Sequence, residues 1–101
     1  MSKPLVLPGP HGRIEVAGDA LDALAATALA PIDGAQLARG RHALELTAVD
    51  ERLDVELQLT VRAGLVLPDV AAQVQQAVAE AVRGATGVEA RVDVLVAGIY
   101  G

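Results

Sequence analysis

Few side chains in this sequence have the types and spacing that could perform chemistry. Cysteine is absent and the histidines, His11 and His42, lie far apart in the chain, whereas protein zinc sites gather several such ligands. The only serine, Ser2, lies in the first residues, so no Ser-His-Asp set can be assembled from ordered parts. We therefore expect no metal, no cofactor, no catalytic residues and no enzymatic activity.

Carboxylates occur in two close pairs. Asp50 and Glu51 are adjacent at an expected turn, where acidic residues are common. Asp54 and Glu56 lie two residues apart in an expected strand, so their side chains point to the same face at a separation of about 7 Å. The second pair could hold a cation, but a solvated polar sheet face is the better explanation.

Two short segments suggest binding. Residues 84–87, Gly-Ala-Thr-Gly, match the G-x-x-G loop with which KH domains clamp a nucleic-acid backbone. The inner residues, Ala85 and Thr86, are not basic. A helix that ends at a glycine C-cap explains the same sequence. Arg39, Arg41 and His42 form a local positive cluster, either a docking loop for an acidic partner or an ordinary solvated loop.

The second half of the chain has the clearest pattern of elements. Apolar residues alternate with polar ones from Leu53 to Val61, which predicts a half-buried strand. Pro68 suits the first turn of a helix and Gly87 suits its end, so we predict a helix from about Pro68 to Thr86. Small apolar residues then occur at every second position and predict a last strand over 88–96: Val88, Ala90, Val92, Val94 and Val96.

The first half completes the expected fold. We expect residues 1–12 to form an irregular tail, with Leu5 to Leu7 able to add an edge strand or cover apolar surface. A single domain, residues 13–101, then follows. Its expected elements are a strand over 13–16, a helix over 19–30, a loop over 31–42, a strand over 42–49 and a turn over 50–52. The β-α-β-β-α-β order predicts an α+β two-layer sandwich, with two helices on one face of a small mixed sheet.

Composition narrows the class of protein. A chain of 101 residues is one domain, and 52% apolar content with one aromatic residue predicts an aliphatic core. The sequence has no run of 18 apolar residues, so we expect no membrane-spanning helix. The apolar segment from Leu5 to Leu7 is too short for the core of a signal peptide. The lack of cysteine fits the cytoplasm. A net charge of −5 disfavours nucleic acid and direct adsorption on anionic lipid.

An ordered set of motifs resembles a known family. Residues 65–70 (Leu-Val-Leu-Pro-Asp-Val), 74–78 (Val-Gln-Gln-Ala-Val), 86–88 (Thr-Gly-Val) and 92–94 (Val-Asp-Val) follow one another at matching spacing. In this order they resemble the bacterial alkaline shock protein family, also called the envelope stress response family, over roughly residues 12–99. The sequence departs from the family at Ala63-Gly64, Asp93, the first turn and the central hairpin turn.

The end of the last strand is apolar on both faces. Leu95, Ala97 and Ile99 alternate with the valine row and so share the opposite strand face, unless a bulge near Gly98 changes the register. A sheet covered on one side only should be polar there. We therefore expect a second covering surface, either the tail at Leu5 to Leu7 or another protein chain, and propose these three residues as a partner interface.

The resemblance implies a non-enzymatic structural or adaptor protein linked to envelope stress. Such a protein would self-associate or dock on a small membrane-anchored partner, and would be cytoplasmic, reaching the inner face of the membrane only through that partner. The alternative, from the tetrapeptide at 84–87 and the α+β layout, is a KH-like module associated with nucleic acid or ribonucleoprotein.

Overall fold

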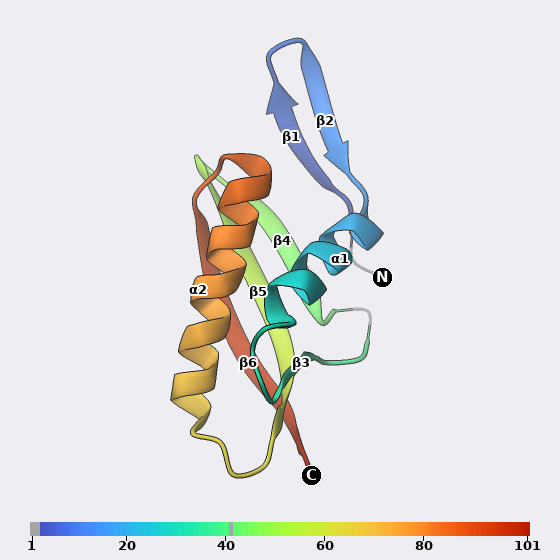
Figure 1. The fold of residues 1–101 in the computed structure, drawn as a ribbon. Helices are drawn as coiled ribbons and strands as arrows, with labels where there is room; N and C mark the ends of the chain where they lie inside the picture. The colour runs from blue at the N-terminus through green and yellow to red at the C-terminus, as the bar shows by residue number, and fades with distance from the viewer. Residues whose placement is uncertain (1–2, 41) are drawn as a thin grey trace.

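The fold is seen in a computed structural model that describes residues 3–40 and 42–101. Two helices and six strands follow one another along this described part of the chain (Figure 1). In chain order they are β1 (Leu5–Gly9), β2 (Gly12–Val16), α1 (Gly18–Leu29), β3 (Ala35–Leu37), β4 (Leu44–Val49), β5 (Arg52–Arg62), α2 (Leu67–Thr86) and β6 (Ala90–Tyr100). The predicted α+β class is confirmed.

Strand β5 is the centre of the main sheet. It pairs antiparallel with β4 and then with β3 along one edge, and parallel with β6 along the other. The sheet is therefore mixed, as predicted. The predicted hairpin between β4 and β5 is present. Its turn is Asp50 and Glu51, one residue shorter than the predicted 50–52, because Arg52 already pairs with Val49.

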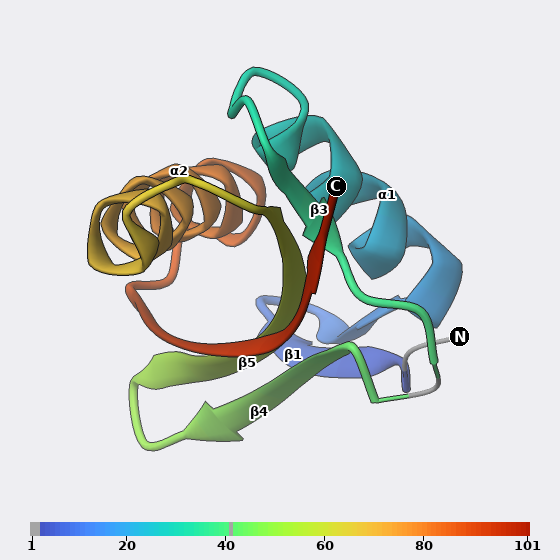
Figure 2. The same cartoon turned by 90° about the horizontal axis from the view of Figure 1, so that it is seen from below.

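Alternation along β5 separates the core from the solvent face. The odd-numbered residues from Leu53 to Val61 are almost fully buried, while Glu56 between them is exposed. Helices α1 and α2 contact each other and cover the buried face, as Figure 2 shows. Four valines of α2 at helical spacing join the same core, which is aliphatic throughout: Val70, Val74, Val78 and Val82.

The ends of α2 agree with the prediction to within a residue. Pro68 lies in its first turn, and Gly87 follows its last residue with φ of 73°, a left-handed conformation that glycine adopts at little cost. Because Gly87 donates its N–H to the carbonyl of Arg83, the end of the helix is closed by the backbone itself.

Residues 5–9 do not belong to an irregular tail; they form the first strand of a hairpin, in agreement with the edge strand offered as an alternative for Leu5 to Leu7. Strand β1 pairs antiparallel with β2, and Gly9 lies opposite Gly12 across a two-residue turn. Leu5 is buried in the main core, which anchors the hairpin, while its tip projects from one end of the molecule (Figure 1). The prolines of this segment favoured an irregular tail in the prediction. Pro8 is nevertheless compatible with β1, because β1 pairs on one side only and an edge strand tolerates proline.

Strand β3 was not predicted. Residues 31–42 were expected to form a loop, yet β3 pairs with Leu59 to Val61 of β5. The carbonyl of Gly34 accepts a hydrogen bond from the Arg62 N–H at 2.8 Å, which extends this pairing. Three residues are too short for a periodic signal, so this strand depends on the presence of β5. With β1 and β3 added, the element order differs from the expected β-α-β-β-α-β.

Candidate functional site

The outer edge of β6 is the candidate site. Among the described residues β6 pairs with β5 alone, although it is eleven residues long. Glu89 and Tyr100 direct their carbonyls to β5, where they accept hydrogen bonds from the N–H groups of Leu53 and Ala63. In a parallel ladder the residues between the bonded ones direct their backbone groups away from the partner strand. Val92, Val94, Val96 and, beyond a register shift, Ile99 therefore face the open edge.

One side chain covers the beginning of this edge. Gln75 of α2 donates a hydrogen bond from Nε2 to the carbonyl oxygen of Val92 at 3.0 Å. An unpaired strand edge offers donors and acceptors to any other strand, and this amide occupies one of the acceptors. The edge is thus covered at Val92 and open from Val94 onward.

Three exposed apolar side chains lie on the open half of β6. Leu95 is 57% exposed, Ile99 is 60% exposed and Tyr100 is 37% exposed. No charged residue occurs from Val94 to the end of the sequence. Natural edge strands are usually blunted by lysine, proline, inward charges or a β-bulge. Of these devices this half of β6 has only a bulge, at Ala97.

The predicted common face of Leu95, Ala97 and Ile99 is wrong. Leu95 lies opposite Gln58 on the polar face, but the register shifts after Leu59, and Ile99 lies opposite the buried Val61. Ala97 is the extra residue of the resulting bulge, which moves Ile99 to the other face of the sheet. Both large side chains remain exposed, so the Leu5 to Leu7 segment does not cover them.

A groove of about 470 Å³ lies at the same end of the molecule as Tyr100. The other residues that line it come from the end of α1, the following loop and β3: Ala26, Leu29, Ala30, Ile32, Asp33, Gly34, Ala35, Gln36 and Leu37. At its rim Arg62 binds Asp33 with both guanidinium nitrogens. These hydrogen bonds and the opposite charge lower the pKa of Asp33 and raise the pKa of Arg62.

The proposed docking loop is only partly seen. Arg41 lies outside the described residues. Arg39 and His42 are both exposed, and His42 shares a 2.8 Å hydrogen bond between its Nδ1 and Glu45. The neighbouring carboxylate offsets the charge of a protonated His42, which weakens the case for a positive docking surface.

Asp54 and Glu56, the pair considered as a cation site, have different neighbours. Asp54 accepts a hydrogen bond from Arg52 at 2.9 Å, and this contact raises the pKa of Arg52. Glu56 instead lies between Glu45 of β4 and Asp93 of β6, its register partners on either side. Within residues 3–40 and 42–101 no three His, Asp or Glu side chains are placed so that they could hold a metal ion.

The tetrapeptide at 84–87 lies in a helix end rather than in an open loop. Gly84 is inside α2, and Thr86 donates from Oγ1 to the carbonyl of Val82 at 2.7 Å. The same oxygen accepts a hydrogen bond from the N–H of Val88. These contacts bind the segment to the protein's own backbone, so the helix-end interpretation of these residues is the correct one.

Sequence reasoning missed the open edge itself and the contact of Gln75 with Val92. Alternation identifies the faces of a strand but not how many partners it has. Gln75 is one of three glutamines in α2, and nothing in their spacing separates it from the others. Among the described residues no helix is both long and apolar enough to cross a membrane.

Comparison with known proteins gives no relative for this chain. No protein-family model, no curated protein and no solved structure matches it.

Proposed function

We propose that this chain is a non-enzymatic structural or adaptor protein of the cytoplasm that self-associates or docks on a partner through the open half of β6. The observation that supports the proposal is the coincidence of an unpaired strand edge with exposed Leu95 and Ile99. A monomer tolerates scattered exposed apolar residues. An edge that also offers free backbone groups is a surface that another strand can extend.

The resemblance to the alkaline shock family supports a role in envelope stress. In that role a small membrane-anchored protein would bring the chain to the inner face of the membrane. The net charge of −5 is in keeping with recruitment by a partner rather than by anionic lipid directly.

The test is the double substitution Leu95→Ser and Ile99→Ser. We expect this variant to keep its fold, because both side chains are largely exposed, and to lose self-association or partner capture. Sedimentation equilibrium over a range of concentrations measures the association, and circular dichroism measures the fold. The matched control replaces Val6 and Val66, which are also exposed, with serine and should associate like the original protein.

Two outcomes would contradict the proposal. If the Leu95/Ile99 variant unfolds while its remaining folded fraction associates normally, these residues belong to the core. If the protein instead binds RNA with an affinity that falls as salt rises, the KH-like alternative gains support.

A further inference from the structure

We propose that two copies of this chain associate by pairing the open halves of β6 antiparallel to each other, about a two-fold axis at Val96. The inference rests on the proposed function and deepens it, because it names the second copy as the occupant of the edge. Antiparallel pairing of one edge with itself is a closed arrangement in which the same surface is used on both subunits.

The limits of the pairing follow from the hydrogen bonds of β6. The carbonyls of β6 that bond to β5 belong to every second residue from Glu89 and, after the bulge, to Tyr100. The backbone N–H and C=O groups of Val94, Val96 and Ile99 therefore point away from β5. Closer to the start of β6, the side chain of Gln75 already donates a hydrogen bond to the carbonyl of Val92. A second strand can therefore bond at three positions and no further toward the start of β6.

The charge pattern leaves this segment as the place where a second copy can approach. The whole chain carries −5, so two copies repel each other over most of their surfaces. The segment from Val94 to Gly101 has no charged side chain, so copies that meet there bring no Asp or Glu side chains of this segment together. It is also rich in β-branched residues, which pair well across strands.

The bulge fixes one register. With Val96 opposite the partner's Val96, Val94 lies opposite the partner's Ile99 on the face that carries the helices. Leu95 then lies opposite the two residues of the bulge, Ala97 and Gly98, which is the two-to-one arrangement that bulges adopt. Each exposed Ile99 thereby gains an apolar neighbour.

The association should be weak. Pairing of one short strand segment buries less surface than the roughly 1,200–2,000 Å² of a stable interface. We therefore expect a monomer–dimer equilibrium that shifts with protein concentration rather than a permanent dimer.

The first experiment removes one backbone donor. Proline in place of Ile99 deletes the N–H that faces the open edge and leaves the ladder to β5 intact, a position at which edge strands tolerate proline. We expect Ile99→Pro to weaken dimerisation at least tenfold in sedimentation equilibrium, with an unchanged circular dichroism spectrum. The control Ile99→Val keeps both the donor and an apolar side chain, and should dimerise within about twofold of the original protein.

The outcomes separate this inference from the proposed function. If the Leu95/Ile99 serine variant loses association but folded Ile99→Pro retains it, side chains alone make the contact and strand pairing is wrong. If the unaltered protein does not associate with itself at any accessible concentration, the second copy is not the occupant. The broader proposal then depends on a different partner.

A second experiment tests the register even if the proline variant fails to fold. The sequence has no cysteine, so introduced thiols are the only ones present. Leu95→Cys and Ala97→Cys chains with different tags, mixed and oxidised, should form mainly the mixed disulfide, because these two positions face each other across the axis. Glu89→Cys, far from the axis, should not crosslink. Equal crosslinking of all three variants would overturn the register.

Discussion

Arg62 holds Asp33 with two parallel hydrogen bonds, from Nη1 to Oδ1 at 2.9 Å and from Nη2 to Oδ2 at 2.7 Å. The two residues are 29 positions apart in the sequence, so the pair ties the loop after α1 to the end of β5. Fork-to-fork geometry of this kind is the strongest form that an exposed ion pair takes.

The pair should make stability depend on pH. Because Arg62 lowers the pKa of Asp33 below its ordinary value of 3.8, the folded state favours the ionised carboxylate. The stabilisation is complete above that ordinary value and is lost as the pH falls through the lowered pKa. We expect Asp33→Asn to be slightly less stable than the original protein at neutral pH, and the difference to vanish in strong acid. Thermal unfolding over a pH series measures this.

Solvent limits the size of the effect, since the Asp33 side chain is 82% exposed. In a chain that already carries Arg62→Gln, the Asp33→Asn substitution should change nothing. A pH-dependent difference that persists in that background would assign it to another group.

The row of carboxylates across the sheet should be a point of instability. Glu56 has Glu45 on one side and Asp93 on the other, and like charges directly opposite each other in a sheet are destabilising. We expect Glu56→Gln to stabilise the fold by about 0.5 kcal/mol, measured by urea denaturation at low salt. Asp54→Asn is the matched control on the same face. It removes the negative charge that pairs with Arg52, and so should not stabilise.

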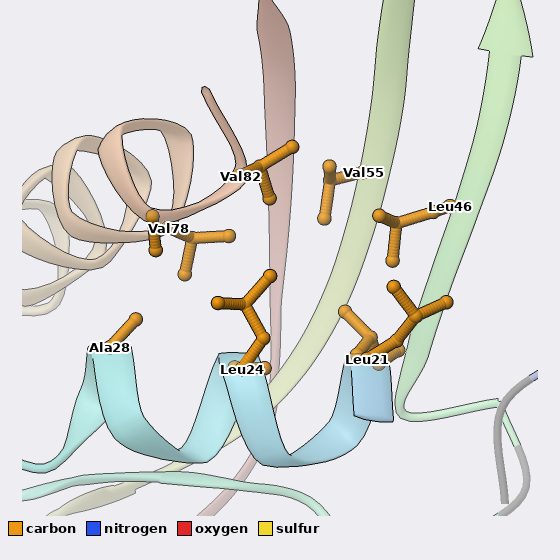
Figure 3. Close-up of a pocket in the computed structure, with 10 residues that line it drawn as sticks. Leu21, Leu24, Ala28, Leu46, Val55, Val78 and Val82 are labelled. Carbon is orange, nitrogen blue, oxygen red and sulfur yellow. The ribbon is translucent and has the colours of Figure 1, made fainter. Parts of the chain in front are cut away.

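The junction of the two helices with the sheet is lined by leucine, valine and alanine alone. It encloses a cavity of about 10 Å³, and Figure 3 shows Val55, Val78 and Val82 among the side chains around it. Such a volume is at the lower limit for one water, and the lining offers no hydrogen bonds. We expect Val55→Ala to cost about 2–3 kcal/mol, from lost burial and a larger void. Val66→Ala, at an exposed valine, should cost about 0.5 kcal/mol or less in the same denaturation experiment.

The turn between β4 and β5 contains a strained residue. Asp50 has φ of 53°, a left-handed conformation that is costly for residues with a Cβ, although aspartate tolerates it better than most. We expect Asp50→Gly to raise stability by about 0.5 kcal/mol and Asp50→Val to lower it by about 1 kcal/mol. If both variants have the same melting temperature, the turn must adopt another conformation in solution.

The elements that sequence predicted well are those with local signals. Pro68 and Gly87 delimit α2 because each acts through its own backbone, and β5 is recognised by alternation that its burial matches. Strand β3 was missed, and β1 was expected only as an alternative to a tail, because both are short and form only beside a partner. Their stability comes from pairing with β2 and β5, which no local pattern encodes.

For the candidate site, sequence identified the residues but not their geometry. Leu95 and Ile99 were chosen because they break the polar alternation expected of an outer face, and both are exposed. Their common face was wrong because a bulge depends on where the ladder to β5 slips. The sequence around Ala97 and Gly98 permits a slip without fixing its place.

The lack of other aromatic residues gives this protein a built-in optical probe. Tyr100 is the only tyrosine, and tryptophan and phenylalanine are absent. It is the last residue of β6, half-exposed beside the open edge and the groove under α1. All intrinsic fluorescence of the chain therefore originates at one end of the molecule, and changes in its intensity or anisotropy would report events there without any label.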